Sequence, residues 1–253
     1  MPFSIPESAT RYGLRTRPGG AHGSKTMMLQ DVRLLFTASA PDTDYSELRR
    51  LVVEENVLLK ATVSNREDVF RNLGSLYGLR QELLLYRALR TLWQTGEQEQ
   101  ALLALLCALA RDPILRATAP TVLEQPEGVA VAPDTLAAAI ETAFPERYGP
   151  KTKLSMSQNT AASWVQAGHL AGKTPKVRKR VTPGPASMAL ALLLGHLCGA
   201  RGRLLFDTGW ARVLDTAPGG LDSLAFAASQ RGWIDFRSMG DVVEIGFTHL
   251  IGE

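Results

Sequence analysis

Long hydrophobic runs are scarce in this 253-residue sequence. The longest one, residues 186–199, includes Ser187 and His196 and is shorter than the roughly 20 apolar residues that cross a bilayer. We therefore expect it to be a buried core helix. Residues 1–13 lack the charged-then-apolar order of a signal peptide. The sequence thus predicts no contact with a membrane.

Cysteine is also rare, and both Cys107 and Cys198 lie in apolar helical patterns. We expect reduced core residues of a cytoplasmic protein rather than a disulfide framework. The four histidines lack the spacing of metal ligands. There is no Ser-His-Asp order, no G-x-S-x-G elbow and no isolated carboxylate pair in an apolar frame. We therefore expect no enzymatic activity, no metal site and no cofactor.

Negative charge is missing from one long segment. Residues 147–206 contain no Asp or Glu and ten Lys or Arg, whereas residues 117–146 contain five acids and no base. The net charge of +3 therefore divides into +10 inside the segment and −7 (18 bases and 25 acids) outside it. Such a block indicates a face that meets a polyanion. The alternative is that these cations scatter over the surface and cancel against acids elsewhere in space.

The basic segment contains Gly172, Lys173 and Thr174, the last three letters of a phosphate-binding P-loop. A P-loop needs its first glycine where Ala167 stands, and it must follow a strand rather than a helix. A second near match, at residues 19–26, has an extra serine between Gly and Lys. Neither stretch predicts nucleotide binding.

A basic wing after a helix fits the segment better. Val177 and Val181 alternate with cations, as in a short two-stranded ribbon, and residues 154–168 form an amphipathic helix. The buried side of that helix would hold Leu154, Ala161, Trp164 and Val165. Cations of the wing would contact DNA phosphates, and Asn and Gln of the helix would reach bases. The competing interpretation is a helix that ends in a solvated basic turn. The candidate DNA-binding residues here are Lys151, Lys153, Ser155, Gln158, Asn159, Lys173, Lys176, Arg178, Lys179 and Arg180.

Two helices joined by a turn are predicted over residues 45–78. A 3.6-residue apolar period marks the first, a capping box of Ser64 and Glu67 opens the second, and Gly78 ends it. This is the order of a helix-turn-helix, although any all-α protein contains such pairs. Before it, residues 1–27 are expected to form a mobile or draped basic arm with little to bury. These two regions add the DNA-binding candidates Lys60, Asn65, Arg66, Arg71, Arg11, Arg15 and Arg17.

The predicted fold class is mainly α: a helical bundle with helix-turn-helix and winged-helix elements and a small C-terminal β-hairpin. Further helices are expected at residues 28–38, 79–95, 97–111, 134–144 (capped by Asp134) and 221–231. A hairpin is expected at 232–247, with Trp233 and Phe236 on opposite faces. We expect three parts: an arm and first helix (1–44), a helical domain with the helix-turn-helix (45–130), and a C-terminal domain with the basic wing and the hairpin (131–253).

Four stretches carry a resemblance to a known family: ELRRLVVEENVLLKATVSNREDVFRNLGSLYGL (47–79), LLALLCALARDPILRA (102–117), SQNTAASWVQAGHLAGKTPKVRKR (157–180), and TGWARVLD with LAFAASQRGWIDFRSMGDVVEIGF (within 208–247). Together they resemble the BrxA family of bacterial BREX phage-exclusion systems. The resemblance implies a small, largely helical, non-enzymatic subunit that binds double-stranded DNA and acts with the system's methyltransferase, ATPase and phosphatase-like components. Two alternatives stay open: an interaction scaffold that docks an acidic protein, and an RNA-binding factor of the NusB type.

Overall fold

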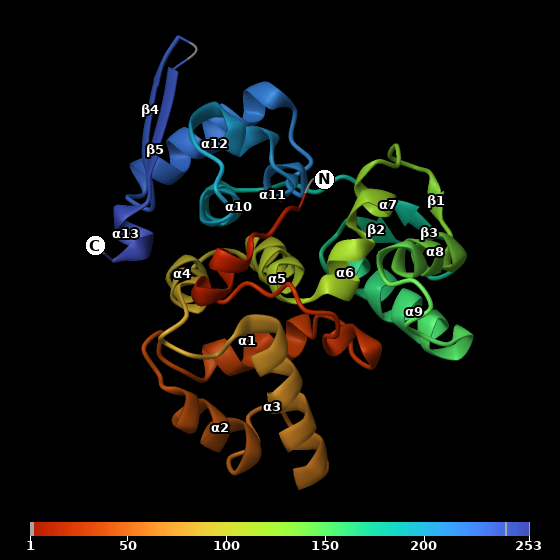
Figure 1. Ribbon diagram of the computed structural model, residues 1–253. Helices are drawn as coiled ribbons and strands as arrows, with labels where there is room; N and C mark the ends of the chain where they lie inside the picture. Colours follow the sequence, from red (N-terminus) through yellow and green to blue (C-terminus); the bar gives the residue numbers. More distant parts are fainter. Residues whose placement is uncertain (1–2, 241, 253) are drawn as a thin grey trace.

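Helices dominate the computed structural model, which describes residues 3–240 and 242–252 (Figure 1). The predicted mainly α-helical fold class is confirmed. In the described residues, β-structure is limited to one sheet of three short strands and one two-stranded hairpin. No helix in this part of the chain combines the length and the apolar character that crossing a membrane requires.

Two apolar helices form the centre of the fold. α5 (Glu97–Arg111) is buried from its second turn to its end, and α10 (Pro185–Leu197) is buried along almost its whole length. The two helices pack against each other, and both also contact α4 (Leu84–Leu92). Because helices that are apolar on every side must be covered on every side, their sequences required this central position.

The N-terminal arm is not the tail with little to bury that we predicted. It forms two 3₁₀ helices, η1 (Glu7–Tyr12) and η2 (Ala21–Gly23). Ala9, Leu14 and Met27 are almost completely buried, and the backbone N–H of Arg15 donates to the carbonyl of Ala110 in α5 at 3.0 Å. Apolar side chains spaced along a polar arm, together with the polar contacts of His22, anchor it to the core. It leads into α1 (Leu29–Thr37), close to the predicted position.

The predicted helix pair is present as α2 (Tyr45–Val53) and α3 (Val63–Tyr77). The hydroxyl of Thr62, and not the predicted Ser64, caps α3 by accepting from the N–H of Asn65 at 3.2 Å. The capping box was therefore placed two residues too late. Gly78 ends the helix with a φ of +87°, as predicted. The connection, residues 54–62, has nine residues, whereas a helix-turn-helix uses a turn of about three or four.

The middle of the chain forms α6 (Pro113–Ala117), α7 (Ala119–Leu123), α8 (Pro133–Ala143) and α9 (Pro150–Gln166). α8 has no side-chain cap, so the predicted cap by Asp134 was wrong. α9 starts earlier than predicted because a proline suits the first turn of a helix. Ala161 and Trp164 are buried as expected, but Leu154 is 48% exposed.

The predicted basic ribbon is a β-hairpin. β2 (Leu170–Ala171) pairs antiparallel with β3 (Lys176–Arg178), in the register Leu170↔Arg178 and Ala171↔Val177. A third strand, β1 (Ala130–Val131), pairs with the other edge of β3 and was not predicted. It comes from the acid-rich stretch before α8. The acid-rich and base-rich segments of the sequence therefore lie side by side.

The C-terminal region places helices before a hairpin, as predicted. After α10 come η3 (Gly202–Asp207), α11 (Gly209–Arg212), α12 (Pro218–Gln230), the strands β4 (Asp235–Met239) and β5 (Val242–Gly246), and α13 (Thr248–Ile251). Phe236 pairs with Ile245 across the hairpin. Trp233 lies before β4, so the expected alternation of Trp233 and Phe236 does not apply. Both rings are half-buried and pack against the core.

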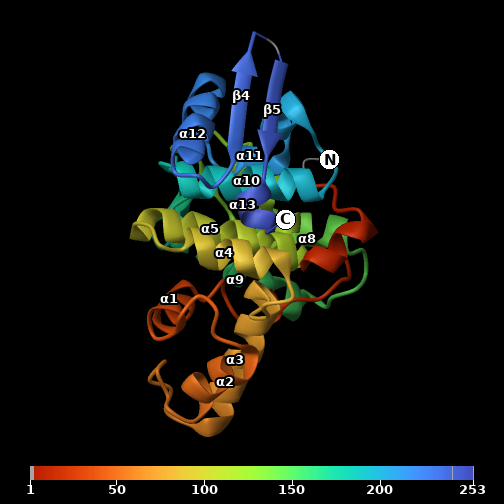
Figure 2. The ribbon, with the colours of Figure 1, turned by 90° about the vertical axis from the view of Figure 1, so that its left-hand side faces the viewer.

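The hairpin and the α2–α3 pair lie at opposite ends of the molecule in both ribbon views (Figures 1 and 2). One continuous cluster of buried side chains nevertheless extends from Ala9 to Leu250. The predicted boundary after residue 130 falls inside β1. All three predicted parts of the chain contribute side chains to the same core.

Candidate nucleic-acid interface

The tip of the ribbon, residues 172–175, carries one exposed cation, Lys173, and is followed by the half-buried Lys176. Gly172 has a φ of +89°, and a Cβ there would lie 3.1 Å from the carbonyl oxygen of Pro175, so the tight turn favours glycine. Lys173 is exposed, and the ammonium of Lys176 donates to the carbonyl of Lys173 at 3.2 Å. In the described residues, neither lysine has a carboxylate at ion-pair distance.

Arg178 does not face solvent, so its assignment as a DNA contact was wrong. Its side chain is 2% exposed, and its guanidinium donates to both carboxylate oxygens of Asp215 at 2.6 and 2.7 Å. Asp215 lies between α11 and α12. This ion pair, in which Nη2 of Arg178 contacts both oxygens, attaches the base of the ribbon to the C-terminal helices. Arg178 therefore positions the ribbon and is not available to a phosphate.

His169, at the start of the ribbon, is buried beside this ion pair. Its Nε2 lies 2.8 Å from the carbonyl of Val213, and its ring meets Trp164 edge-on with centroids 5.1 Å apart. The Nδ1 atom is buried without a hydrogen-bond partner. Burial lowers the pKa of His169 to about 4, although the Val213 carbonyl and Asp215 act in the opposite direction. The histidine is a neutral packing residue.

Several other cations of the basic block have acidic neighbours from the same chain. Lys153 contacts Glu141 at 2.6 Å, Lys179 lies 3.9 Å from Glu127, and Arg180 lies 3.8 Å from Asp215. The alternative prediction, that cations of the basic segment are neutralised by acids close to them in space, therefore holds for these three residues. The side chains of Lys179 and Arg180 are still 52% and 61% exposed. Ion pairs at such exposure are weak, with a median of about 0–1 kcal/mol, and can be exchanged for phosphate contacts.

On the polar face of α9, some side chains are exposed to solvent and others are hydrogen-bonded within the fold. Gln158 and Lys151 are exposed, and Ser155 is half-buried. The side-chain amide of Asn159 donates to the carbonyl of His22 at 3.1 Å, which ties α9 to the arm. Asn159 is therefore engaged in the fold, and only Gln158 keeps its amide free for a base-reading contact in the part of the chain that is described.

The DNA-binding candidates of the arm and of the α2–α3 pair do not extend the surface formed by the ribbon and α9. Arg66 donates to backbone carbonyls of Val53 and Lys60, Lys60 pairs with Asp31 at 2.6 Å, and Arg15 donates to Ser75. These contacts hold the arm, α1, α2 and α3 together. The remaining members of the predicted set are Asn65, Arg17, Arg11 and Arg71; the first two are exposed, Arg11 donates to Tyr12, and Arg71 pairs with Asp68. The predicted residues form separate groups rather than one surface.

The fold brings together a serine, a histidine and an aspartate that the sequence analysis did not connect. His22 of η2 places Nδ1 2.8 Å from the carboxylate of Asp112 and Nε2 2.8 Å from the hydroxyl of Ser163. All three side chains are buried, and the Ser163 hydroxyl also accepts from the N–H of Met27 at 2.8 Å. The arrangement has no access for a substrate. It is a buried clamp that fastens the arm between α5 and α9.

Asp112 is the centre of this clamp. Its carboxylate also accepts from the N–H groups of Ile114 and Leu115 at 2.9 and 3.2 Å, and so caps α6. Burial by itself would raise the pKa of Asp112, but the charge and hydrogen bonds of His22 and the backbone donors outweigh it and lower the pKa. No spacing rule could have indicated this contact, because its residues come from three distant segments.

Compared with known proteins, the chain matches no family model and no curated protein. Within residues 3–240 and 242–252, no group of three or more His, Cys, Asp and Glu side chains could hold a metal ion.

Proposed function

We propose that this chain is a non-enzymatic DNA-binding protein whose β2–β3 ribbon contacts the phosphate backbone of duplex DNA. The supporting observation is the ribbon itself, which presents Lys173 and Lys176 at its tip and Lys179 and Arg180 at its firmly attached base. Lysine and arginine side chains gain affinity for DNA mainly by releasing counterions from phosphates. Since phosphate contacts carry no base information, they position the protein rather than select a sequence. Gln158 on the neighbouring helix supplies the proposed contact to base edges.

The setting we propose is the cytoplasmic DNA-directed machinery of a BREX phage-exclusion system, in which the chain is an accessory subunit of the BrxA kind. This part of the proposal rests on the ordered sequence resemblance alone. Its test is copurification of the tagged chain with the methyltransferase, ATPase or phosphatase-like components of such a system.

The test of DNA binding compares two variants with equal changes of charge. Lys173→Ala/Lys176→Ala removes the two cations of the ribbon tip. Arg231→Ala/Arg237→Ala removes two exposed cations near the C-terminal hairpin. If each tip lysine neutralises one phosphate, counterion release predicts a loss of affinity for duplex DNA of about 30-fold at 0.15 M salt. The control variant should bind like the wild type. Equal binding by all three proteins would contradict the proposal.

A second candidate function is docking of an acidic protein, because Lys179 and Arg180 already lie near carboxylates of their own chain. The same variants distinguish the two functions when duplex DNA, an RNA hairpin and single-stranded DNA are offered in parallel. Preference for the duplex supports the proposal, and preference for the hairpin supports the RNA-binding alternative. Absence of binding to all three would favour the protein-docking scaffold.

A further inference from the structure

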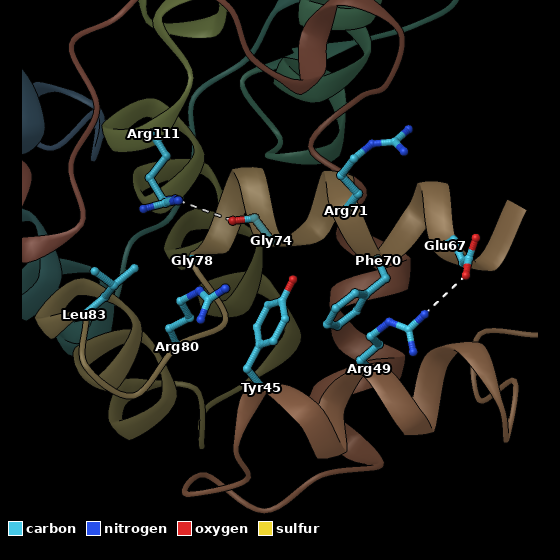
Figure 3. Close-up of a pocket in the computed structure, with 10 residues that line it drawn as sticks. All are labelled: Tyr45, Arg49, Glu67, Phe70, Arg71, Gly74, Gly78, Arg80, Leu83 and Arg111. Atoms are coloured by element: carbon cyan, nitrogen blue, oxygen red, sulfur yellow. Dashed lines mark hydrogen bonds and ion pairs between the residues drawn. The ribbon is translucent and has the colours of Figure 1, made fainter. Parts of the chain in front are cut away.

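A cleft of about 380 Å³ opens between α2, α3, the loop after α3 and the end of α5 (Figure 3). Its volume lies in the range of small-molecule sites, which begins at about 300 Å³. Four guanidinium groups and two aromatic rings dominate its lining: Arg49, Arg71, Arg80, Arg111, Tyr45 and Phe70. The only acid among the lining residues is Glu67. The cleft therefore has a surplus of positive charge.

Two of these arginines are neutralised by the chain and two are not. Arg49 lies 3.2 Å from Glu67, and Arg71 pairs with Asp68. In the described residues, Arg80 and Arg111 have no carboxylate at ion-pair distance. The uncompensated charge is thus concentrated on the side of the cleft where Figure 3 shows Arg80 and Arg111.

Arg111 is the more unusual of the two because its side chain is buried. Its guanidinium donates to the backbone carbonyls of Ser75, Gly13 and Gly74, which use three of its five N–H donors. These contacts fix the group in place but leave its charge uncompensated, and two donors remain. Burial lowers the pKa of Arg111 to about 10, so the group stays charged at neutral pH. A buried, fixed cation beside a cleft is suited to an anionic ligand.

The lining between the arginines is aromatic. The ring of Tyr45 carries the guanidinium of Arg80 at 4.2 Å from its centroid, and the ring of Phe70 is tilted against it at 5.0 Å. Figure 3 shows both rings between the arginines of the two sides. Phe70 is 4% exposed, so a planar ring system would pack mainly against the half-buried Tyr45 and the Arg80 guanidinium on its ring, while its phosphate meets the cations.

Gly74 gives an independent indication of a ligand. It lies inside α3, where glycine costs about 1 kcal/mol relative to alanine. A Cβ at this position would meet nothing within 4 Å, so the packing of the chain does not require a glycine. Gly74 also lines the cleft. Close approach of a ligand to the helix backbone explains why the side chain is absent.

We propose that this cleft binds a nucleotide, with the phosphate at Arg80 and Arg111 and the base beside Tyr45 and Phe70. The nucleotide is either free or part of a single strand, since both present the same phosphate and ring. The site is separate from the β2–β3 ribbon and does not depend on the ribbon's binding of duplex DNA.

The test titrates pyrophosphate, ADP and an oligothymidylate of about eight nucleotides into the full-length chain by isothermal titration calorimetry. The expected result is binding of ADP or of the oligonucleotide, with pyrophosphate weaker than ADP. Arg80→Ala should weaken binding at least about tenfold, because it removes a charged contact. Gly74→Ala should raise the melting temperature and yet weaken binding, which no purely structural role of Gly74 predicts. The free and strand-bound sources are told apart by whether ADP or the oligonucleotide binds more tightly.

Arg237→Ala serves as the control and should leave the titrations unchanged. Absence of binding of all three probes at millimolar concentration would overturn the proposal, as would binding that Arg80→Ala and Gly74→Ala leave intact. Pyrophosphate binding as tight as that of ADP would overturn the role given to the two rings. Lys173→Ala/Lys176→Ala should weaken binding of duplex DNA and leave binding of ADP unchanged, so failure of one site is distinguishable from failure of the other.

Discussion

The ion pair at the base of the ribbon yields a prediction about stability. Replacing Asp215 by asparagine leaves the buried guanidinium of Arg178 without its counter-charge, and the Nε of that group already lacks a partner in the described residues. Removing one member of a buried pair costs about 3–5 kcal/mol. Because small proteins are stable by about 5–15 kcal/mol in total, the variant should unfold at clearly lower urea concentration.

Both members can instead be replaced by apolar residues. Arg178→Met/Asp215→Leu leaves no buried charge, and such double replacements are often neutral or stabilising. We therefore expect the double variant to be more stable than Asp215→Asn. The assay is urea unfolding followed by tryptophan fluorescence, since Trp164 packs against His169 near the pair. A cost below about 1 kcal/mol for Asp215→Asn would refute the reasoning, because the pair would then behave like an exposed one.

Two further predictions concern the arm and pH. Gly20→Ala should destabilise the protein by about 2 kcal/mol or more, because a Cβ would overlap the Asp112 carboxylate and the φ of +153° disfavours alanine; faster proteolysis of the arm is the readout. The pKa of His169 in the folded state, about 4, lies below the usual value of 6.5, so the unfolded chain takes up its proton first as the pH falls. The contribution of His169 to the free energy of unfolding is therefore complete above pH 6.5. It decreases by roughly 3 kcal/mol between pH 6.5 and pH 4, since each pKa unit is worth about 1.4 kcal/mol. His169→Gln should flatten urea midpoints across that range, and an unchanged pH dependence would contradict this assignment.

Apolar periodicity and helix-ending residues predicted those helices and strands whose bounds depend on neighbouring residues. The bounds of α5 follow from its apolar run and Pro113. The valines that alternate with cations predicted the basic ribbon but not its bounds, since Val181 lies outside β3. The N-terminus of α3 was misplaced because Thr62 and Ser64 are both good caps, and only the backbone geometry decides between them.

Long-range partners could not be predicted in this way. Arg178 has the same local pattern as its neighbours Lys176 and Lys179, and its burial depends on Asp215, which is 37 residues away in the chain. The charge of the cleft could not be predicted for a similar reason: Arg111 is next to Asp112 in the sequence, but Asp112 pairs with His22 in the fold, and no carboxylate of the described residues lies at ion-pair distance from Arg111.

The salt dependence of duplex DNA binding tests the central claim most directly. If Lys173, Lys176, Lys179 and Arg180 each neutralise one phosphate, the logarithm of the association constant should fall against the logarithm of salt with a slope of about −3.6. The slope for Lys173→Ala/Lys176→Ala should be about −1.8, and that for Arg231→Ala/Arg237→Ala should equal the wild type. A slope that the ribbon variant shares with the wild type, or a flat dependence for both, would contradict the account.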